Sequence, residues 1–217
     1  SISLYSFMNP TGFNDRIARG AIAQEVTLEV GQNIAVIQMA GECANVLDKD
    51  YFASADTTEK GGLVSFPAEP ASPTYNGSPV VGFTGSATMD SNAIGDIYTA
   101  TVRIRNGNAL VKNNFNTFYP TGAEGDVREV LLSFTLSDAD TAIQAVNLRN
   151  KALSQTSIAV VLVVGTAAGS IMTITLPKVV LTPANIDEQR RNVLAFNDCL
   201  CLASSGTLKD ECKLKFT

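Results

Sequence analysis

The chain has 217 residues, with 16 Lys and Arg, 21 Asp and Glu and no His, and its formal net charge is −5. The absence of His excludes Ser-His-Asp and Cys-His catalysis, an imidazole general base and His ligands for zinc. The negative charge disfavours nucleic-acid binding, because affinity for a phosphate backbone comes largely from Lys and Arg that displace counterions. Charged residues are only 17% of the chain, so we expect much of the surface to be uncharged or covered by another chain.

The length favours one domain, residues 1–217, that needs neither a disulfide nor a metal to be stable. Ser1–Asp15 contains no basic stretch followed by an apolar one, so it does not resemble a secretory signal. We therefore expect synthesis in the cytosol.

The N-terminal part predicts an extended arm followed by a hairpin. Ser1–Gly20 has no sustained period and contains a turn signal, so we expect it to be the arm. Ala21–Val30 alternates apolar and polar residues, as a half-buried strand does, and Asn33–Met39 is its expected partner. The polar positions of the first strand are Glu25, Thr27 and Glu29. Two Glu on one strand face are compatible with acid and base chemistry, but a solvated face is favoured because nothing beside them forms the apolar pocket that would separate their pKa values.

The next segment, Gly41–Ser86, predicts a long extended loop. Gly and Pro interrupt every regular pattern in it, and a loop of this length is usually functional. It contains five aromatic residues, which are Tyr51, Phe52, Phe66, Tyr75 and Phe83. These side chains need an apolar surface to pack against, and we expect that surface to lie on a neighbouring subunit.

The second half predicts one-sided sheet strands and a single helix. Ile97–Arg105 and Arg128–Leu136 alternate apolar and polar residues. A capping-box pattern at Ser137 predicts a helix to Leu153, which we expect to plug an open end of a sheet or barrel. Further strands are predicted at Ile158–Val164, Ile171–Val180, Val193–Ala203 and Glu211–Thr217. The predicted fold class is mainly β and antiparallel, with one flanking α-helix and a long extended loop.

Three other patterns are better explained by structure than by function. The four cysteines, Cys43, Cys199, Cys201 and Cys212, lack the spacing of a zinc site and are expected to be small buried side chains. Asp90–Asp96 begins like a calcium loop, but the twelfth position is Thr101 rather than Glu, so a polar turn is favoured. The uncharged segment Ala152–Pro177 is expected to be strand, turn and strand rather than a membrane helix. The sequence therefore predicts no metal, no cofactor and no membrane segment.

Three segments in the second half carry a family resemblance. They are Val102–Leu110, with its Asn-rich turn, Arg128–Leu136, of the form R-x-V-x-x-x-F-T-L, and Ile174–Leu181, of the form I-x-L-P-x-V-x-L. In their order and spacing, over about residues 97 to 217, they resemble the major tail tube protein of long-tailed bacteriophages of the siphophage type. The first half matches the family in the position of its hairpin and long loop rather than in residues. The chain departs from the family pattern in Asn106-Gly107-Asn108 and in Cys199-Leu200-Cys201.

The resemblance implies a β-sandwich or half-barrel subunit that is a structural virion protein and not an enzyme. It implies assembly into rings, hexameric in the family, that stack into a tube through which double-stranded DNA passes during ejection without specific binding. The implied partners are other copies of the chain and the tape measure, terminator and baseplate proteins of the tail. The implied location is the virion, after synthesis in the cytoplasm of a host bacterium.

The tube hypothesis assigns candidate site residues. The residues expected to face the lumen are the polar ones on strands with an apolar opposite face, namely Glu25, Thr27, Glu29, Glu129 and Ser133. The residues expected to contact the next ring are the loop aromatics Tyr51, Phe52, Phe66, Tyr75 and Phe83. Acidic and hydroxyl side chains would repel or merely hydrate DNA, which lets the polymer slide.

Two alternatives remain open from the sequence. One is a β-sandwich binding module of a tail fibre, baseplate or neck that recognises carbohydrate or protein, and the other is a pilin-like subunit. The absence of Trp counts against a carbohydrate site, which usually offers exposed aromatic platforms.

Overall fold

A computed structural model describes residues 2–6, 15–55, 65–68, 80, 82, 85–95, 97–112, 115, 119–137, 147–166, 169–186 and 193–217. The fold is mainly β, the strand pairs are antiparallel, and the described residues contain two short helices, which confirms the predicted fold class. The chain forms two compact units. Unit 1 comprises Ser1–Glu25, Met39–Tyr75 and Asn106–Val127, and unit 2 comprises Val26–Gln38, Asn76–Arg105 and Arg128–Thr217. Strands β2 (Arg16–Gly31) and β3 (Val36–Glu42) run through both units.

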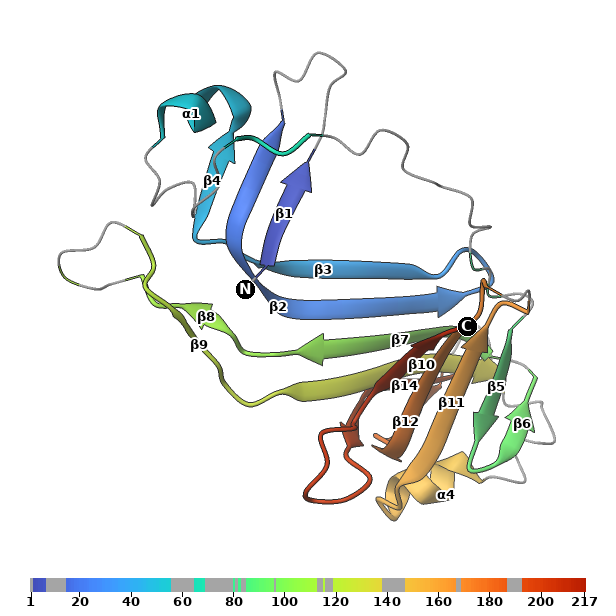
Figure 1. The fold of residues 1–217 in the computed structure, drawn as a ribbon. Coiled ribbons are helices and arrows are strands. Elements are labelled where there is room, and N and C mark those ends of the chain that lie inside the picture. Colours follow the sequence, from blue (N-terminus) through green and yellow to red (C-terminus); the bar gives the residue numbers. More distant parts are fainter. Residues whose placement is uncertain are drawn as a thin grey trace. The chain divides into compact units, whose positions relative to one another are not determined.

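Unit 1 is built around the first half of β2 (Figure 1). Its other elements are β1 (Ile2–Ser6), β4 (Asn45–Asp48), α1 (Lys49–Ser54), β8 (Ala109–Leu110) and β9 (Ala123–Glu124). Ile17 of β2 pairs with Tyr5 of β1 and with Leu47 of β4, so β1 and β4 flank β2 on opposite edges. Strands β8 and β9 form a separate two-stranded sheet.

Unit 2 holds most of the sheet. Its strands are β5 (Ser86–Met89), β6 (Asn92–Ile94), β7 (Ile97–Arg105), β10 (Glu129–Ser137), β11 (Ile158–Val164), β12 (Met172–Val180), β13 (Asn185–Ile186), β14 (Val193–Leu202) and β15 (Lys213–Phe216). The strand order from β2 onward is β2-β7-β10-β14-β12-β11-β5-β6, and its helix is α4 (Leu148–Leu153). Alternate residues of β2, β7, β10, β14, β12, β11 and β5 join one core cluster, so the sheet curls until one of its faces encloses that core.

The core of unit 2 is apolar and closely packed. Phe134 of β10 stacks on Phe196 of β14, with ring centroids 4.9 Å apart and an interplanar angle of 16°. Phe196, Leu136 and Ile174 are fully buried. Complete burial of such side chains is worth about 1.5 to 3 kcal/mol each, which makes this cluster the main source of stability.

The predicted strands agree with the structure in the second half and less well in the first. β7 and β11 have the predicted ends. The Ser1–Gly20 arm differs from the prediction because it contains β1 and the start of β2. The predicted Gly41–Ser86 loop is ordered at its beginning, where Asp48 caps α1 by accepting a hydrogen bond from the Tyr51 backbone N–H at 2.7 Å.

The predicted helix Ser137–Leu153 differs at its start. Ser137 is the last residue of β10, where it pairs with Val193 and is buried. The described helix α4 covers only Leu148–Leu153, and residues 138–146 lie outside the described residues. Sheet pairing therefore takes precedence over the capping-box pattern at Ser137.

Pro177 interrupts one edge of β12. β11 occupies one edge of β12 from Met172 to Val179, whereas β14 pairs with Lys178–Val180 and β15 with Met172–Thr175 on the other edge. Proline has no N–H to offer a ladder, so a partner strand has no donor to pair with there. The chain accordingly leaves the edge after Leu202, forms the loop 203–212, and returns to the same edge as β15.

Candidate functional site

The polar face of β7 and β10 is the best-defined part of the predicted lumen surface. Glu129 of β10 lies opposite Arg105 of β7, and the Arg105 Nη1 and Glu129 Oε2 atoms are 3.5 Å apart. Both side chains are nearly half exposed, so this ion pair is worth only about 0 to 1 kcal/mol. Near the other end of the same strand pair, Thr99 and Thr135 bring their hydroxyl oxygens to within 2.7 Å of each other.

This face carries more basic than acidic side chains, so it is not the acidic wall that the sequence predicted. Arg103 and Arg105 share it with Glu129, because residues paired across antiparallel strands project from the same side of the sheet. The period-2 alternation of residues 97–105 places the two arginines on a polar face, but the sequence does not reveal which strand they pair with. Sequence reasoning therefore missed that these two arginines lie beside Glu129.

Ser133 has a structural role in addition to its predicted position. Its hydroxyl oxygen accepts a hydrogen bond from the backbone N–H of Asp198 at 2.9 Å. Asp198 has a φ of 51°, and the pairing of β10 with β14 shifts register at this point. Ser133 thus satisfies the N–H that the β-bulge in β14 removes from the ladder.

The three predicted lumen residues of β2 are divided between the units. Glu25 and Thr27 are half-buried, and Glu29 is exposed and accepts a hydrogen bond from Gln38 Nε2 at 3.4 Å. Glu25 belongs to unit 1, whereas Thr27 and Glu29 belong to unit 2 with Glu129 and Ser133. Glu129 and Ser133 lie on the same face of β10.

Two of the predicted inter-ring aromatics pack inside unit 1. Phe52 is only 3% exposed and meets Phe66 edge to face, with ring centroids 5.6 Å apart. Lys49 Nζ lies 5.8 Å from the centre of the Phe66 ring and 3.4 Å from Asp15 Oδ2. The expectation that this aromatic needs a neighbouring subunit is thus wrong for Phe52, since its own unit already buries it.

Of the remaining loop aromatics, Tyr51 belongs to the described residues. Tyr51 of α1 is 49% exposed and remains a candidate contact residue. Tyr75 and Phe83 lie outside the described residues.

The Asn-rich turn of the family resemblance holds β2. Asn106 Nδ2 and Asn108 Nδ2 both donate hydrogen bonds to the carbonyl oxygen of Ala23, at 3.3 and 3.2 Å. Gly107 between them has a φ of +58°, and a Cβ there would lie 2.7 Å from the Cβ of Asp126. The Asn106-Gly107-Asn108 turn therefore has a structural explanation. Its two amides bind the Ala23 carbonyl, and its glycine leaves room for Asp126.

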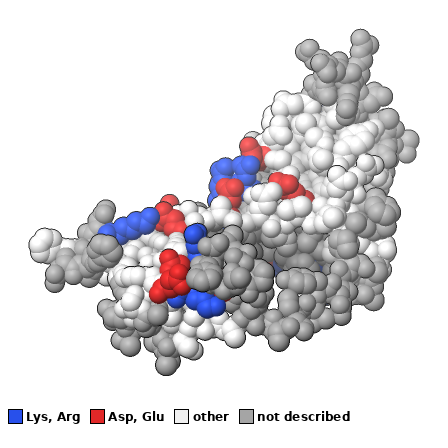
Figure 2. Space-filling view, turned by 90° about the horizontal axis from the view of Figure 1, so that it is seen from above, with Lys and Arg blue, Asp and Glu red and all other residues white. Residues whose placement is uncertain are grey.

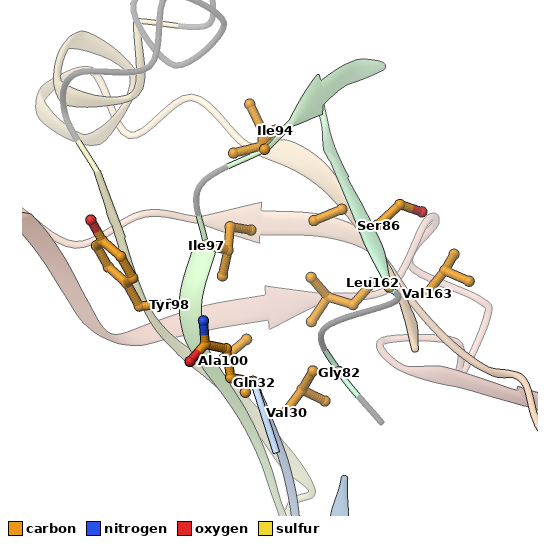
Figure 3. Close-up of a pocket in the computed structure, with 14 residues that line it drawn as sticks. Val30, Gln32, Gly82, Ser86, Ile94, Ile97, Tyr98, Ala100, Leu162 and Val163 are labelled. Atoms are coloured by element: carbon orange, nitrogen blue, oxygen red, sulfur yellow. The ribbon is translucent and has the colours of Figure 1, made fainter. Parts of the chain in front are cut away.

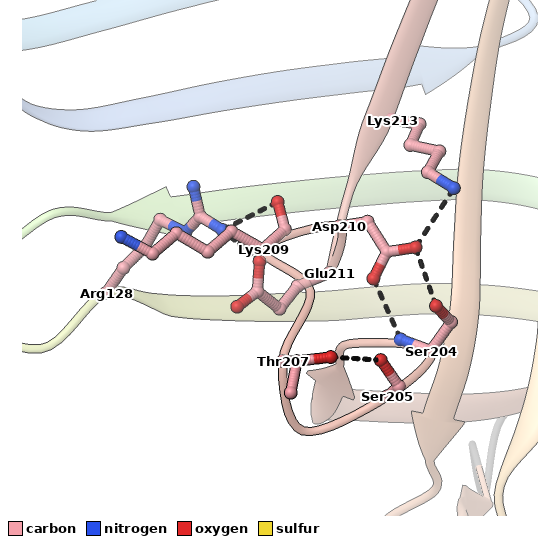
Figure 4. Close-up of polar contacts among 8 residues, drawn as sticks. All are labelled: Arg128, Ser204, Ser205, Thr207, Lys209, Asp210, Glu211 and Lys213. Carbon is pink, nitrogen blue, oxygen red and sulfur yellow. Dashed lines mark hydrogen bonds and ion pairs between the residues drawn. The ribbon is translucent and has the colours of Figure 1, made fainter.

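Loop 203–212 of unit 2 is closed by a polar network around Asp210 (Figure 4). Asp210 accepts hydrogen bonds from the Ser204 N–H at 2.9 Å and the Ser204 hydroxyl at 2.8 Å, and its Oδ2 lies 2.9 Å from Lys213 Nζ. The hydrogen bond from Lys213, followed by those from Ser204, lowers the pKa of Asp210 to about 2. Arg128 adds contacts to the Lys209 carbonyl oxygen at 3.2 Å and to Glu211. Each of these contacts lies within the loop or between it and adjoining strands, which indicates a structural role.

The described residues line two cavities, one in each unit. A cavity of about 230 Å³ in unit 2 includes Val30, Ile97, Tyr98, Leu162 and Val163 in its lining, and no charged residue lines it (Figure 3). A cavity of about 260 Å³ in unit 1 is lined mainly by apolar residues of β1, β2 and β3. The lining of the unit 1 cavity also includes Cys43 and Glu42, and Glu42 Oε1 lies 2.8 Å from Lys112 Nζ.

Cys199 and Cys201 of unit 2 are buried thiols, and Cys212 is half-buried. Burial raises the pKa of Cys199, that of Cys201 to about 12 and that of Cys212 to about 11. Among the described residues, no group of three or more Cys, Asp or Glu gathers to hold a metal ion.

The charge is distributed unevenly between the units. Unit 1 contains 5 Lys and Arg and 10 Asp and Glu, for a net charge of −5, and unit 2 contains 11 of each, for a net charge of 0. On the face seen in Figure 2, most of the described surface is uncharged, and the charged side chains there lie as neighbours of opposite sign. Large one-sign patches of the kind that bind nucleic acid are not seen on the described part of that face.

None of the helices in the described part of the chain is long and apolar enough to cross a membrane. Comparison of the sequence with models of protein families gives no match, and comparison with curated proteins gives none.

Proposed function

We propose that this protein is a structural subunit that assembles with copies of itself into stacked rings, forming the tail tube of a long-tailed bacteriophage. The observation that carries the proposal is the open edge of β3. All of its residues up to Gly41 are exposed and uncharged, including Val36, Ile37 and Met39, which are 41%, 41% and 71% exposed. Within the described residues, β2 is the one strand that pairs with it. Such an edge is an aggregation liability in a monomer and is removed when copies join edge to edge.

The ordered motifs of the second half support the same proposal. The Asn-rich turn fixes β2, the segment from Arg128 to Leu136 covers most of β10, and Ile174–Leu181 covers most of the interrupted strand β12. These are the strands that build the sheet rather than surface features, so the resemblance concerns the scaffold. The family assignment, the ring and the virion location rest on this resemblance.

A wall made from the polar face of β7 and β10 suits a passage for DNA. Arg105 is neutralised by Glu129, and Thr99 and Thr135 bond to each other. The Arg105–Glu129 pair and the two threonine hydroxyl groups give DNA little unpaired charge to bind at these positions. We assign this face, with Glu29 and Thr27 of β2, to the lumen, and tape measure, terminator and baseplate proteins to the partners of the assembled tube.

The test is assembly of the purified protein, followed by sedimentation velocity and negative-stain microscopy. We expect rings or tubes with a central hole, and dispersed monomers at high concentration would overturn the proposal. A second arm uses Ile37→Lys, which places a charge on the β3 edge and should prevent assembly while leaving the unfolding midpoint nearly unchanged. Its matched control is Val127→Lys, at an 82% exposed position outside any strand, which should assemble normally.

A further inference from the structure

One outer surface of unit 2 combines lysines with exposed leucines. Lys213 and Lys215 of β15 lie opposite Thr175 and Thr173 of β12, which alternate with the buried residues of that strand. These lysines therefore project away from the core. Lys178 also projects outward, at the point where β11 shifts register along β12, and its partner on β14 is Leu202. We call Lys178, Leu200, Leu202, Lys213 and Lys215 the lysine–leucine face.

The face has charges and apolar area that unit 2 leaves unmatched. Lys213 has Asp210 at 2.9 Å, but Lys178 and Lys215 have no carboxylate partner among the described residues. Leu200 and Leu202 are each 41% exposed. An apolar strip edged by cations favours a partner that offers apolar side chains together with carboxylates.

Unit 1 offers that combination. It carries the entire net charge of −5, whereas unit 2 is neutral. Val46 of β4 and Tyr51 of α1 are 51% and 49% exposed, and Asp50 beside Tyr51 is exposed. Asp50 has no cationic partner among the described residues.

We propose that the lysine–leucine face of one copy binds the β4–α1 surface of unit 1 on a second copy, with Asp50 facing the lysines. The two surfaces are different, so the contact is head to tail and can propagate through many copies, as a ring or stack requires. Exposed charges set the orientation and rate of such contacts, and salt weakens them. This inference rests on the proposed self-assembly and names one pair of surfaces through which it occurs.

The test is a charge swap. K178E/K215E and D50K should each fail to assemble alone, raising the concentration for half-assembly at least about tenfold, because like charges then face each other. An equimolar mixture of the two variants should assemble again, since every contact in an alternating array is then complementary. The matched controls are Lys209→Glu in loop 203–212 and Glu124→Lys on β9, which reverse charges outside the two surfaces and should assemble like the unmodified protein. Circular dichroism and the unfolding midpoint of each variant confirm that it is folded.

The outcomes separate the two proposals. If the unmodified protein does not self-associate, both fail. If it forms tubes and both charge variants form them equally well, the pair of surfaces is wrong while the proposed function stands. If both variants fail to assemble and their mixture also fails, the lysines and Asp50 do not face each other and the inference is overturned.

Discussion

The two units of the chain differ in how they are stabilised. Unit 2 encloses a core to which nearly all of its strands contribute, whereas the separate cluster in unit 1 consists of Ile17, Leu47, Phe52 and Ala55, with Phe66 packed against it. Unit 1 also carries all of the net negative charge, and self-repulsion opposes compactness. The comparison indicates that unit 2 is the folded scaffold and that unit 1 depends more on contacts made outside it.

The largest expected contrast between the units is in thiol reactivity. At pH 8, a thiol with a pKa of about 12 is a thiolate about a thousandfold less often than an ordinary cysteine, so Cys201 should resist alkylation. Cys43 of unit 1 is half-buried and lines an open cavity, so it should react first. Mass spectrometry of peptides after iodoacetamide treatment measures the order. Equal labelling of Cys43 and Cys201 in the folded protein would contradict this difference in thiol reactivity between the units.

The next effect is global destabilisation by Phe196→Ala. Loss of the ring that stacks on Phe134 should lower the free energy of unfolding by about 3 to 5 kcal/mol, because the surrounding strands cannot close the cavity. Denaturant titration followed by circular dichroism measures the change. A loss under about 1 kcal/mol would show that the core of unit 2 is not the scaffold.

Phe52→Ala should destabilise unit 1 alone. The expected loss is about 3 kcal/mol, at the lower end for a buried Phe, because the cluster is small and can collapse in part. Hydrogen exchange should show faster exchange at β4 and α1 and unchanged exchange at β10 and β14. Faster exchange throughout the chain would mean that the two units unfold together, which would contradict their separate stabilities.

The smallest expected effect is in the loop network of unit 2. Because the pKa of Asp210 falls from 3.8 to about 2 on folding, its stabilising contribution is complete above about pH 4 and is lost as the pH falls through 2. Asp210→Asn should therefore lower the unfolding midpoint at pH 7, and the difference from the unmodified protein should vanish near pH 2. Ser204→Ala, which removes one donor, should raise the pKa of Asp210 partway, as measured by NMR titration of the carboxyl carbon. An Asp210 that titrates near its ordinary value would show that the network does not form.

The sequence predicts the strand positions in unit 2 far better than the contacts between side chains of neighbouring strands. Alternation identifies β7 and β10 because each has one core face and one polar face, and this pattern is local. The pairing of Arg105 with Glu129 joins strands that are not adjacent in sequence, and alternation carries no information on which strands pair. The turn between Arg105 and the next strand is predictable in position, but the two amides that hold Ala23 are not.

The elements of unit 1 are harder to predict for a related reason. α1 has six residues, and propensity is a weak signal over so short a stretch. The residues that bury Phe52, such as Ile17, come from the N-terminal segment that has no clear period. The sequence therefore identifies an aromatic that needs burial and leaves open which surface supplies it.

The position of β14 has a consequence for synthesis of the chain. This strand ends at Leu202, yet it lies in the middle of the sheet, between β10 and β12. Until the ribosome has released it, β10 and β12 have no neighbour on those edges, and the core lacks Phe196, Cys199 and Cys201. Pairing of strands so distant in sequence makes folding slow, because loop-closure entropy is lost before contacts compensate for it. We expect the nascent chain to bind chaperones until its last strands emerge, and a chain truncated before Val193 to aggregate rather than fold.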